Sequence, residues 1–247
     1  MDRKHGLRLW KRDYEVLKLL DSGLFGSGQL SRLFFSSRKK CSERMKKLFR
    51  AGLVGRFQRP LLDVRGKPEF VYCKKGKSVR GLFKVEHCLA VSEFFVLWKT
   101  WLKAVGSLVG EFFFEGVLPG LLDGSLVPDS VCVLRCGGKE LLFFVEVDCG
   151  TESLLGGCYG FADKFGLYAD LFDSGSYSEV FSGKTFRGFR VLVVFKSEAR
   201  LKNFLKLVKE QGHDFVLACT FEKLDRFGVG GTCWSGVDKE LCDVFGK

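Results

Sequence analysis

Histidine is scarce in this sequence, and neither histidine nor cysteine has the spacing of a metal-binding motif. The three histidines are His5, His87 and His213, and no two are separated by a single residue. This excludes an enzyme built on a His-x-His cluster beside a tyrosine nucleophile. The ten cysteines include no C-x-x-C, and the nearest pair is Cys132 and Cys136. Most stand in apolar segments, where a thiol packs as a small hydrophobic group. We therefore expect neither a structural zinc site nor a disulfide framework.

Long apolar runs are also missing. The longest apolar region, residues 85–117, is interrupted by Glu93, Lys99, Lys103 and Glu111, so it is not a bilayer-spanning helix. The first sixteen residues are charged and lack the apolar core of a signal peptide. No Walker loop or dinucleotide-binding fingerprint occurs. With 46% apolar and 28% charged residues, the chain suits a packed core rather than disorder. We expect a cytoplasmic protein with no membrane partner.

Charge is distributed unevenly along the chain. Residues 1–84 contain 23 Lys/Arg and 7 Asp/Glu, a net charge of +16. Residues 85–247 contain 17 Lys/Arg and 22 Asp/Glu, a net charge of −5. This asymmetry predicts two modules, of which the first meets a polyanion. We expect domains at 1–84 and 111–247, joined by a connecting helix over 85–110.

The basic segment shows three helical patterns followed by a hairpin. Apolar spacing predicts a helix over 11–24, and Ser27 is suited to cap a short second helix. A third helix ends at Gly52 and places Cys41, Met45, Leu48 and Phe49 on one apolar stripe. Two short strand-like segments, 53–58 and 69–73, flank a basic loop. Three helices and a basic hairpin are the order of a winged helix-turn-helix, whose third helix enters the major groove of double-stranded DNA.

Basic and polar residues of this module are candidates for DNA contact. They are Arg38, Lys39, Ser42, Lys46, Lys47 and Arg50 on the third helix, and Arg59, Arg65 and Lys67 in the wing. Base edges would be read by the outer face of the helix, and phosphates would be held by the wing. The alternative is a solvated amphipathic helix with ordinary surface lysines.

The second module alternates between strand and helix patterns. Strands are expected at 111–118, 130–136, 140–147, 189–195 and 215–221, and helices at 85–105, 151–172 and 198–211. Gly137-Gly138 predicts a hairpin turn between the second and third strands. This order predicts an α/β sandwich with a mixed sheet.

Three carboxylates flank the predicted hairpin. Asp129 precedes its first strand, whereas Glu146 and Asp148 end its second. The strands run antiparallel, so these ends are neighbours, and Glu146 and Asp148 share one face. Glu111 or Glu115 from the preceding strand would extend the cluster. Clustered carboxylates need a cation, and Mg²⁺ or Mn²⁺ bound by Asp129, Glu146 and Asp148 would activate water and stabilise a phosphoryl transition state. Alternatively, Asp129 only caps a strand and one of the other acids faces solvent.

The pattern P-D, strand, turn, strand, E-x-x resembles the PD-(D/E)xK nuclease core. Asp148 stands where the motif has lysine, and Lys164 on the following helix is the candidate substitute. Longer strings, "VEHCLAVSEFFV", "LVPDSVCVL" and "FFVEVDCGTES", resemble the plasmid replication-relaxation family. They also resemble conjugative relaxases in which a winged helix precedes a restriction-endonuclease-like core. The implied catalytic set is Asp129, Glu146, Asp148, Lys164, Glu111 and Glu115.

This resemblance implies a metal-dependent enzyme that nicks DNA at a plasmid origin during mobilisation or replication, with other proteins of those processes as partners. One alternative is a non-enzymatic replication initiator or regulator whose nuclease-like domain is inert, because the motif lysine is absent. A protein-interaction module is a third hypothesis, but it would leave the +16 segment without a role.

Overall fold

The computed structural model describes residues 3–4, 6–59, 69–77, 81–115, 126–150, 161–179, 181, 184, 186–237 and 241–245. Backbone contacts divide the chain into two compact units, Met1–Val96 and Leu97–Lys247. The boundary lies inside one long helix, α4 (Leu82–Val105). Among the described residues, no helix combines the length and apolar character needed to cross a membrane.

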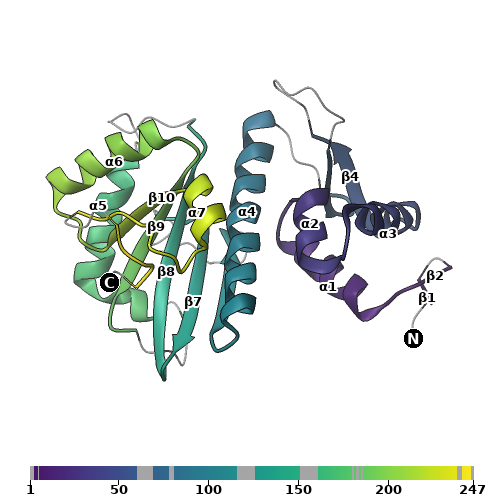
Figure 1. The fold of residues 1–247 in the computed structure, drawn as a ribbon, viewed down its shortest axis with the longest axis horizontal. Helices are drawn as coiled ribbons and strands as arrows, with labels where there is room; N and C mark the ends of the chain where they lie inside the picture. The colour runs from purple at the N-terminus through teal and green to yellow at the C-terminus, as the bar shows by residue number, and fades with distance from the viewer. Residues whose placement is uncertain are drawn as a thin grey trace. The chain divides into compact units, whose positions relative to one another are not determined.

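Ahead of α4, the described residues of the N-terminal unit form three helices, a three-stranded antiparallel sheet and a two-stranded one (Figure 1). Its elements are β1 (Arg3–Lys4), β2 (Leu7–Arg8), α1 (Lys11–Ser22), β3 (Phe25–Gly26), α2 (Ser27–Phe34), α3 (Arg38–Arg50), β4 (Val54–Gln58) and β5 (Phe70–Lys74). β5 lies between β3 and β4 and pairs with both in antiparallel register. The short strand β3, between α1 and α2, had no signal in the sequence.

Helix α3 has the amphipathic pattern that the sequence predicted, with one exception. Cys41, Met45 and Leu48 are fully buried, and the Ser37 hydroxyl caps the helix by accepting a hydrogen bond from the Lys40 N–H. Phe49 was expected on the same stripe but is exposed. Each residue of a helix is rotated by about 100° from the one before it, so the Phe49 side chain points away from the core side on which Leu48 lies. The Arg56 guanidinium lies over the Phe49 ring, 4.3 Å from its centroid.

A buried aspartate connects α3 to α1. Asp13 is fully buried; its carboxylate accepts from the Trp10 N–H at 2.7 Å and from Arg44 Nε at 2.9 Å. Arg44 also donates to the Arg8 carbonyl at 2.7 Å. A buried charge is tolerated only with such partners. This pair therefore orients α3, and it directs Arg44 inward while the neighbouring basic side chains stay outside.

The C-terminal unit is a five-stranded mixed sheet with helices on its faces (Figure 1). After α4 come β6 (Val109–Phe114), β7 (Ser130–Cys136), β8 (Lys139–Asp148), α5 (Phe161–Ser174), the 3₁₀ turn η3 (Ser176–Glu179), β9 (Phe189–Phe195), α6 (Glu198–Gln211), β10 (Val216–Thr220) and α7 (Phe221–Phe227). The strand order is β10-β9-β8-β7-β6. β6, β7 and β8 are antiparallel, whereas β8, β9 and β10 are parallel. The predicted mixed α/β architecture is confirmed.

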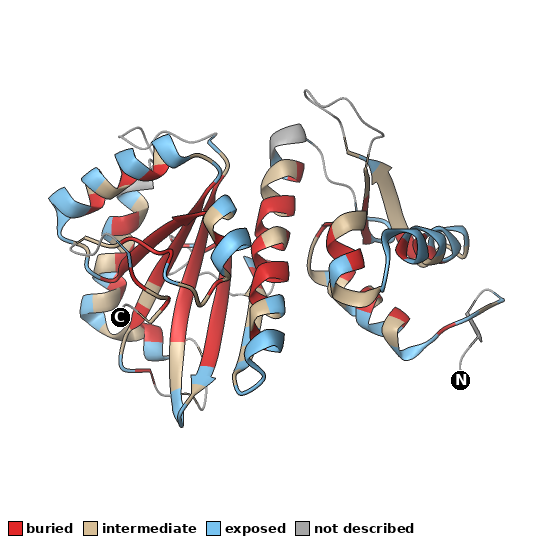
Figure 2. Ribbon diagram, viewed as in Figure 1, coloured by how far each residue is buried: buried red, intermediate tan, exposed pale blue. Residues whose placement is uncertain are grey.

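The central strands are buried on both faces (Figure 2). Residues of α5 and α6, including Phe165, Tyr168 and Phe204, pack on one face. On the other face Trp98 of α4 lies edge-on to Phe143 of β8. A strand covered on both faces is a nearly continuous apolar run, so carboxylates inside it stand out.

The end of the last strand departs from the sequence prediction, and parts of two other predicted elements lie outside the described residues. The last strand ends at Thr220, and the following residues form α7. The Thr220 hydroxyl accepts from the Lys223 N–H at 3.3 Å, which caps the new helix. Of the helix predicted over 151–172, the described part begins at Phe161, and 151–160 lie outside the described residues. Residues 116–118 of the predicted first strand also lie outside them.

Candidate active site

The antiparallel register of β7 and β8 brings Asp129 to the end of β8. Ser130 pairs with Val145, so Asp129 lies beside Glu146 and Val147. The Asp129 carboxylate accepts a hydrogen bond from the Val147 N–H at 2.7 Å. The predicted hairpin thus forms from residues 130–136 and 139–148, and its register brings these two acids together.

Glu146 is the central group of the site. It is 1% exposed, and both carboxylate oxygens are bound by side chains of α5. Lys164 Nζ donates to Oε2 at 2.7 Å, and the Tyr168 hydroxyl donates to Oε1 at 2.5 Å. Burial raises the pKa of Glu146 to about 7; the Lys164 ammonium opposes this rise, and the charge of Asp129 adds to it. A carboxyl group with this pKa titrates near neutrality, as residues in catalytic sites often do.

The raised pKa of Glu146 predicts a pH-dependent stability. Between its ordinary pKa of 4.5 and about 7, the folded protein keeps a proton that the unfolded chain releases, so the free energy of unfolding falls as pH rises through this window. At higher pH, the stabilisation from the proton on Glu146 is fully lost, and the free energy of unfolding falls no further for this reason. Denaturant unfolding from pH 4.5 to 8 should show this fall in the parent and a flatter profile in Glu146→Gln. Equal slopes for the two proteins would contradict the raised pKa.

Asp148 lies on the same face of β8 but has different partners. It is 4% exposed and is bound by Arg200 of α6, with Nε to Oδ2 at 2.6 Å and a second nitrogen to Oδ1 at 3.1 Å. The Gly150 N–H also donates to Oδ1 at 2.6 Å. This bidentate pair neutralises Asp148 within the protein.

The predicted three-carboxylate metal set does not form. In the part of the chain that the structure describes, no three His, Cys, Asp or Glu residues are grouped to hold an ion. The reason is the position of Arg200, which provides Asp148 with a cation of its own. Asp129 and Glu146 remain as the acidic pair.

Glu111 of β6 and Glu115, which directly follows β6, do not add their side chains to this acidic pair. Glu111 is cross-strand from Val133, three residues and roughly 10 Å along β7 from Ser130, and it is bound by Lys184 at 2.6 Å. The Glu115 side chain is exposed, although its N–H donates to the Asp129 carbonyl at 3.2 Å. β6 is also separated from β8 by β7.

The remaining residues fit a Mg²⁺ or Mn²⁺ site of the usual kind. Mg²⁺ in proteins is typically held by one or two carboxylates, with water and substrate phosphate oxygens completing its shell. Asp129 and Glu146 supply two carboxylates from adjacent strand ends. A cation beside Glu146 would favour its ionised form and so oppose the burial that raises its pKa.

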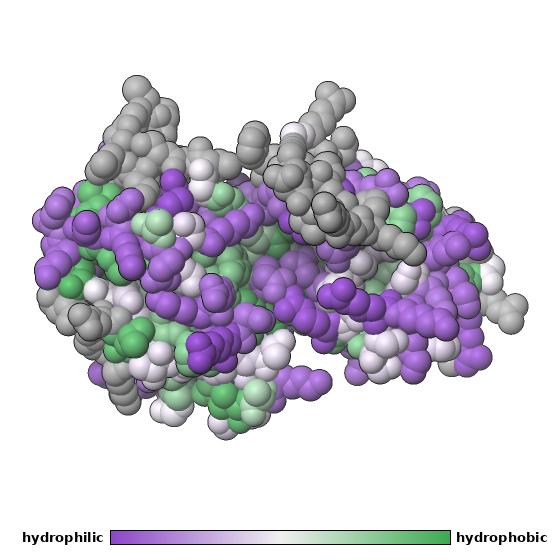
Figure 3. Space-filling view, turned by 45° about the horizontal axis from the view of Figure 1, so that its top comes forward, coloured by the Kyte–Doolittle hydropathy of each residue, from purple (hydrophilic) through white to green (hydrophobic). Residues whose placement is uncertain are grey.

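The candidate DNA-contacting side chains of α3 all lie on its exposed face (Figure 2). Those exposed are Arg38, Lys39, Ser42, Lys46, Lys47 and Arg50. Figure 3 shows that hydrophilic side chains dominate the visible surface of this unit. Arg59, predicted in the wing, is instead bound by Glu86, with Nε to Oε1 at 2.7 Å. Arg65 and Lys67 lie outside the described residues.

Two residues of the acidic site were not predicted from the sequence. Tyr168 stands four residues after Lys164, and this helical spacing places both side chains on one face, so the pair had a detectable signal. Arg200 lies in the first turn of α6. Nothing in its local sequence links it to Asp148, which is 52 residues away.

Comparison with known proteins gives a weak likeness. No family model and no curated protein matches the sequence, so the resemblance to the replication-relaxation family stays a prediction. A structure of restriction endonuclease FokI bound to DNA aligns with a TM-score of 0.33 and 15% identity over 87% of this chain and 43% of that one. A second FokI structure gives 0.35 and 14%, over 88% and 42%. The chain spans less than half of either, and a likeness this weak establishes neither a fold family nor an activity.

Proposed function

We propose that this protein binds double-stranded DNA through its N-terminal unit and cleaves a phosphodiester bond with a divalent-metal site on Asp129 and Glu146. The observation that supports cleavage is Glu146 itself, a buried acid held between Lys164 and Tyr168 beside a second carboxylate. Burial without a use for the charge is costly. The hairpin, helix and parallel strand that carry these groups are the order expected of a restriction-endonuclease-like core.

The chain's own residues supply distinct parts of this chemistry. Asp129 and Glu146 would hold the ion, which activates water and offsets charge on the phosphate when bound. Lys164, with 26% of its side chain exposed, would place a cation beside the attacked phosphorus. Tyr168 would orient Glu146 through its hydrogen bond. The attacking water oxygen would form a bond to phosphorus and give up one proton, the bond from phosphorus to one ester oxygen would break, and that oxygen would take up one proton as it leaves.

A winged helix-turn-helix is our proposal for the N-terminal unit. Its support is the element order α1, β3, α2, α3, β4, β5 together with the exposed basic surface of α3. The bound Asp13–Arg44 pair would orient α3 for the major groove. Arg59 is engaged with Glu86, so α3 rather than the start of the wing would provide the main phosphate contacts.

Replacing Lys46 and Arg50 with alanine should weaken DNA binding on the order of tenfold at moderate salt. Both side chains are exposed on α3, and each phosphate contact that is lost lowers the slope of log affinity against log salt by about 0.9. Fluorescence anisotropy across a salt series measures both quantities. Lys18→Ala, an exposed lysine of α1, serves as the matched control and should leave the slope unchanged. An unaltered slope in the double variant would remove α3 from the interface.

Within this function, we propose that the biological target is a plasmid origin, which the protein nicks in the cytoplasm during mobilisation or replication with other proteins of those processes. The competing proposal is a DNA-binding initiator or regulator without chemistry. One observation favours it: Lys164 and Arg200 already neutralise Glu146 and Asp148 inside the protein.

Nicking of supercoiled plasmid DNA tests the enzymatic proposal against its competitor. The parent protein should convert supercoiled plasmid carrying its origin region to open circles with Mg²⁺ or Mn²⁺ and leave it intact with EDTA. Added metal should also raise the melting temperature, because an ion that binds the folded state stabilises it. Tight DNA binding without nicking or a metal-dependent thermal shift would decide for the non-enzymatic protein.

A further inference from the structure

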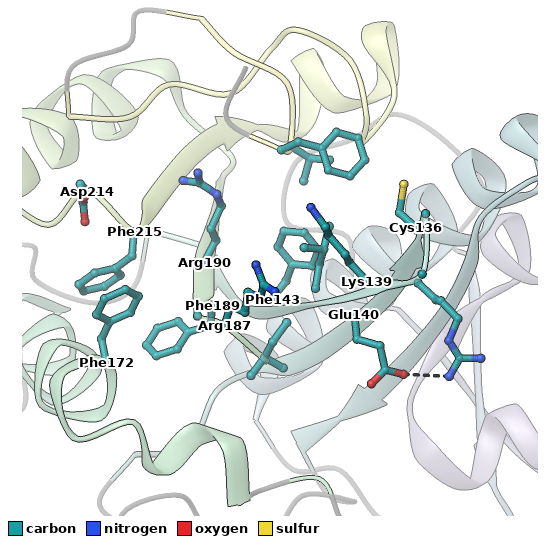
Figure 4. Close-up of a pocket in the computed structure, with 18 residues that line it drawn as sticks. Cys136, Lys139, Glu140, Phe143, Phe172, Arg187, Phe189, Arg190, Asp214 and Phe215 are labelled. Carbon is teal, nitrogen blue, oxygen red and sulfur yellow. Dashed lines mark hydrogen bonds and ion pairs between the residues drawn. The ribbon is translucent and has the colours of Figure 1, made fainter. Parts of the chain in front are cut away.

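The cavity of the C-terminal unit does not present one binding surface (Figure 4). It has a volume of about 1100 Å³. Arg190 is in register with Phe143, which meets α4, so this cation lies on the α4 face of the sheet. Phe172 and Phe189 pack against each other on the face that α5 and α6 cover. The walls of the cavity thus belong to two sides of the sheet, and the N-terminal unit offers a better-defined surface.

An exposed tryptophan lies at the start of helix α1. Trp10 is 52% exposed, whereas Trp98 and Trp234 are fully buried. The backbone holds the ring in place, because the Trp10 N–H donates to the buried carboxylate of Asp13 at 2.7 Å and the preceding Leu9 is buried. A large ring that is fixed in position loses little conformational freedom when a partner covers it. Trp10 is therefore suited to a binding contact.

Positive charge surrounds this ring. Residues 8–12 read RLWKR, with three cations and no acid. The Arg12 guanidinium lies 5.5 Å from the ring centroid of Trp10 and 4.3 Å from that of Phe35. In the part of the chain that the structure describes, Arg12 has no carboxylate partner, and its buried Nε has no hydrogen-bond acceptor. A cation that is held against aromatic rings without a counter-charge favours an anionic partner.

Arg44 connects this surface to the exposed basic side of α3. Its guanidinium lies 5.2 Å from the Trp10 ring centroid and donates to the Arg8 carbonyl at 2.7 Å. On α3, Lys40 and Lys47 stand one turn before and one turn after Arg44, and both are exposed. Trp10 therefore borders the side of α3 that includes Lys47, one of the candidate DNA contacts.

We propose that Trp10 and the basic residues beside it form a second contact with double-stranded DNA, next to that of α3. The ring would pack against sugar groups of the DNA backbone, and Lys11 and Arg12 would bind the flanking phosphates. A second copy of this chain fits less well, because its residues 1–84 carry a net charge of +16 and would repel this surface. The inference rests on the proposed DNA binding of the N-terminal unit and extends it beyond α3.

Fluorescence anisotropy of a short labelled duplex with the full-length protein tests this contact. Trp10→Ala should weaken binding by on the order of tenfold, as loss of a central aromatic contact does. The slope of log affinity against log salt should stay unchanged, because a ring contact releases no counterion, whereas Lys11→Ala should lower that slope by about 0.9. Trp10→Phe keeps an aromatic ring and should retain most of the affinity.

Phe227→Ala on α7 is the matched control. The Phe227 ring is 51% exposed and lies 5.0 Å from the Arg226 guanidinium, so it resembles Trp10 in exposure and in its cationic neighbour. It belongs to the C-terminal unit, and its loss should leave DNA affinity unchanged.

Acrylamide quenching of tryptophan fluorescence tests the same contact in the unaltered protein. Trp10 is the most exposed of the four tryptophans, so it should dominate quenching in the free protein. Bound duplex should shield the ring and reduce the quenching. Trp10→Phe should show weak quenching that DNA changes little, which assigns the signal to this residue.

Three distinct results would overturn the inference. A parent protein that binds no duplex at any salt concentration would remove the DNA-binding function as well. Duplex binding that Trp10→Ala leaves intact, or that leaves the ring open to acrylamide, would remove only this second contact. Dimers of the parent that Trp10→Ala dissociates, with unchanged DNA affinity, would assign the surface to a second copy of the chain.

Discussion

Glu146→Gln should lower metal-dependent nicking by on the order of 10²-fold or more and leave DNA affinity nearly unchanged. Removal of one preorganised electrostatic group at a transition state costs about this much, and Glu146 lies at the end of β8, not on the exposed face of α3. The amide keeps the shape of the side chain but carries no charge for an ion. The variant should also lose the rise in melting temperature that Mg²⁺ gives the parent.

Two companion variants make this result specific. Glu210→Gln removes an exposed carboxylate of α6 and should retain full nicking. Tyr168→Phe removes the hydrogen bond to Glu146 Oε1 but leaves the metal-binding charge. It should reduce nicking less than Glu146→Gln does and shift the pH profile upward, because loss of that donor raises the pKa of Glu146 further. Nicking by purified Glu146→Gln at the parent rate would eliminate the site.

The sequence predicted the secondary structure well because its signals are local. The buried stripe of α3 and the Gly137-Gly138 turn are read within a few residues, and both are found in the structure. β3 was missed because a strand of two residues depends on its distant partner β5. α7 was missed although its cap is local, since the Thr220 hydroxyl accepts from the Lys223 N–H. Phe49 was misplaced because a residue at the edge of an apolar stripe reaches solvent as easily as the core.

The acidic site was predicted in position but not in its charge partners. Strand register alone places Asp129 beside Glu146, so the hairpin sequence was sufficient. The partner of Asp148 could not be predicted from the sequence, because Arg200 lies on α6 and meets Asp148 only through the packing of that helix on the sheet. Arg59 shows the same limit, since its pairing with Glu86 spans 27 residues and the start of another helix. Charge counts show that cations are present, not which acids they bind.

The Asp148–Arg200 pair should therefore be structural, and Arg200→Gln should destabilise the protein by about 3 kcal/mol. The carboxylate is 2% exposed in its side chain, and removal of one partner leaves an uncompensated buried charge. The expected fall in melting temperature is roughly 6–12 °C for a chain of this size. Denaturant unfolding of the parent, both single variants and Asp148→Asn/Arg200→Gln gives the coupling energy directly.

The double variant separates a structural cation from a catalytic one. Under the proposed nuclease function Asp148 would stand where the motif has lysine, and Arg200, which binds Asp148, would lie close to where that cation acts. If Lys164 is the catalytic cation, neutralising both Asp148 and Arg200 should restore most of the stability lost in Arg200→Gln. The double variant should nick DNA within about tenfold of the parent rate, since no group that contacts the phosphate has been removed. Lys164→Met should instead stay inactive while DNA binding persists. A double variant that is stable and binds DNA, yet does not nick it, would indicate that Arg200 and not Lys164 provides the catalytic cation.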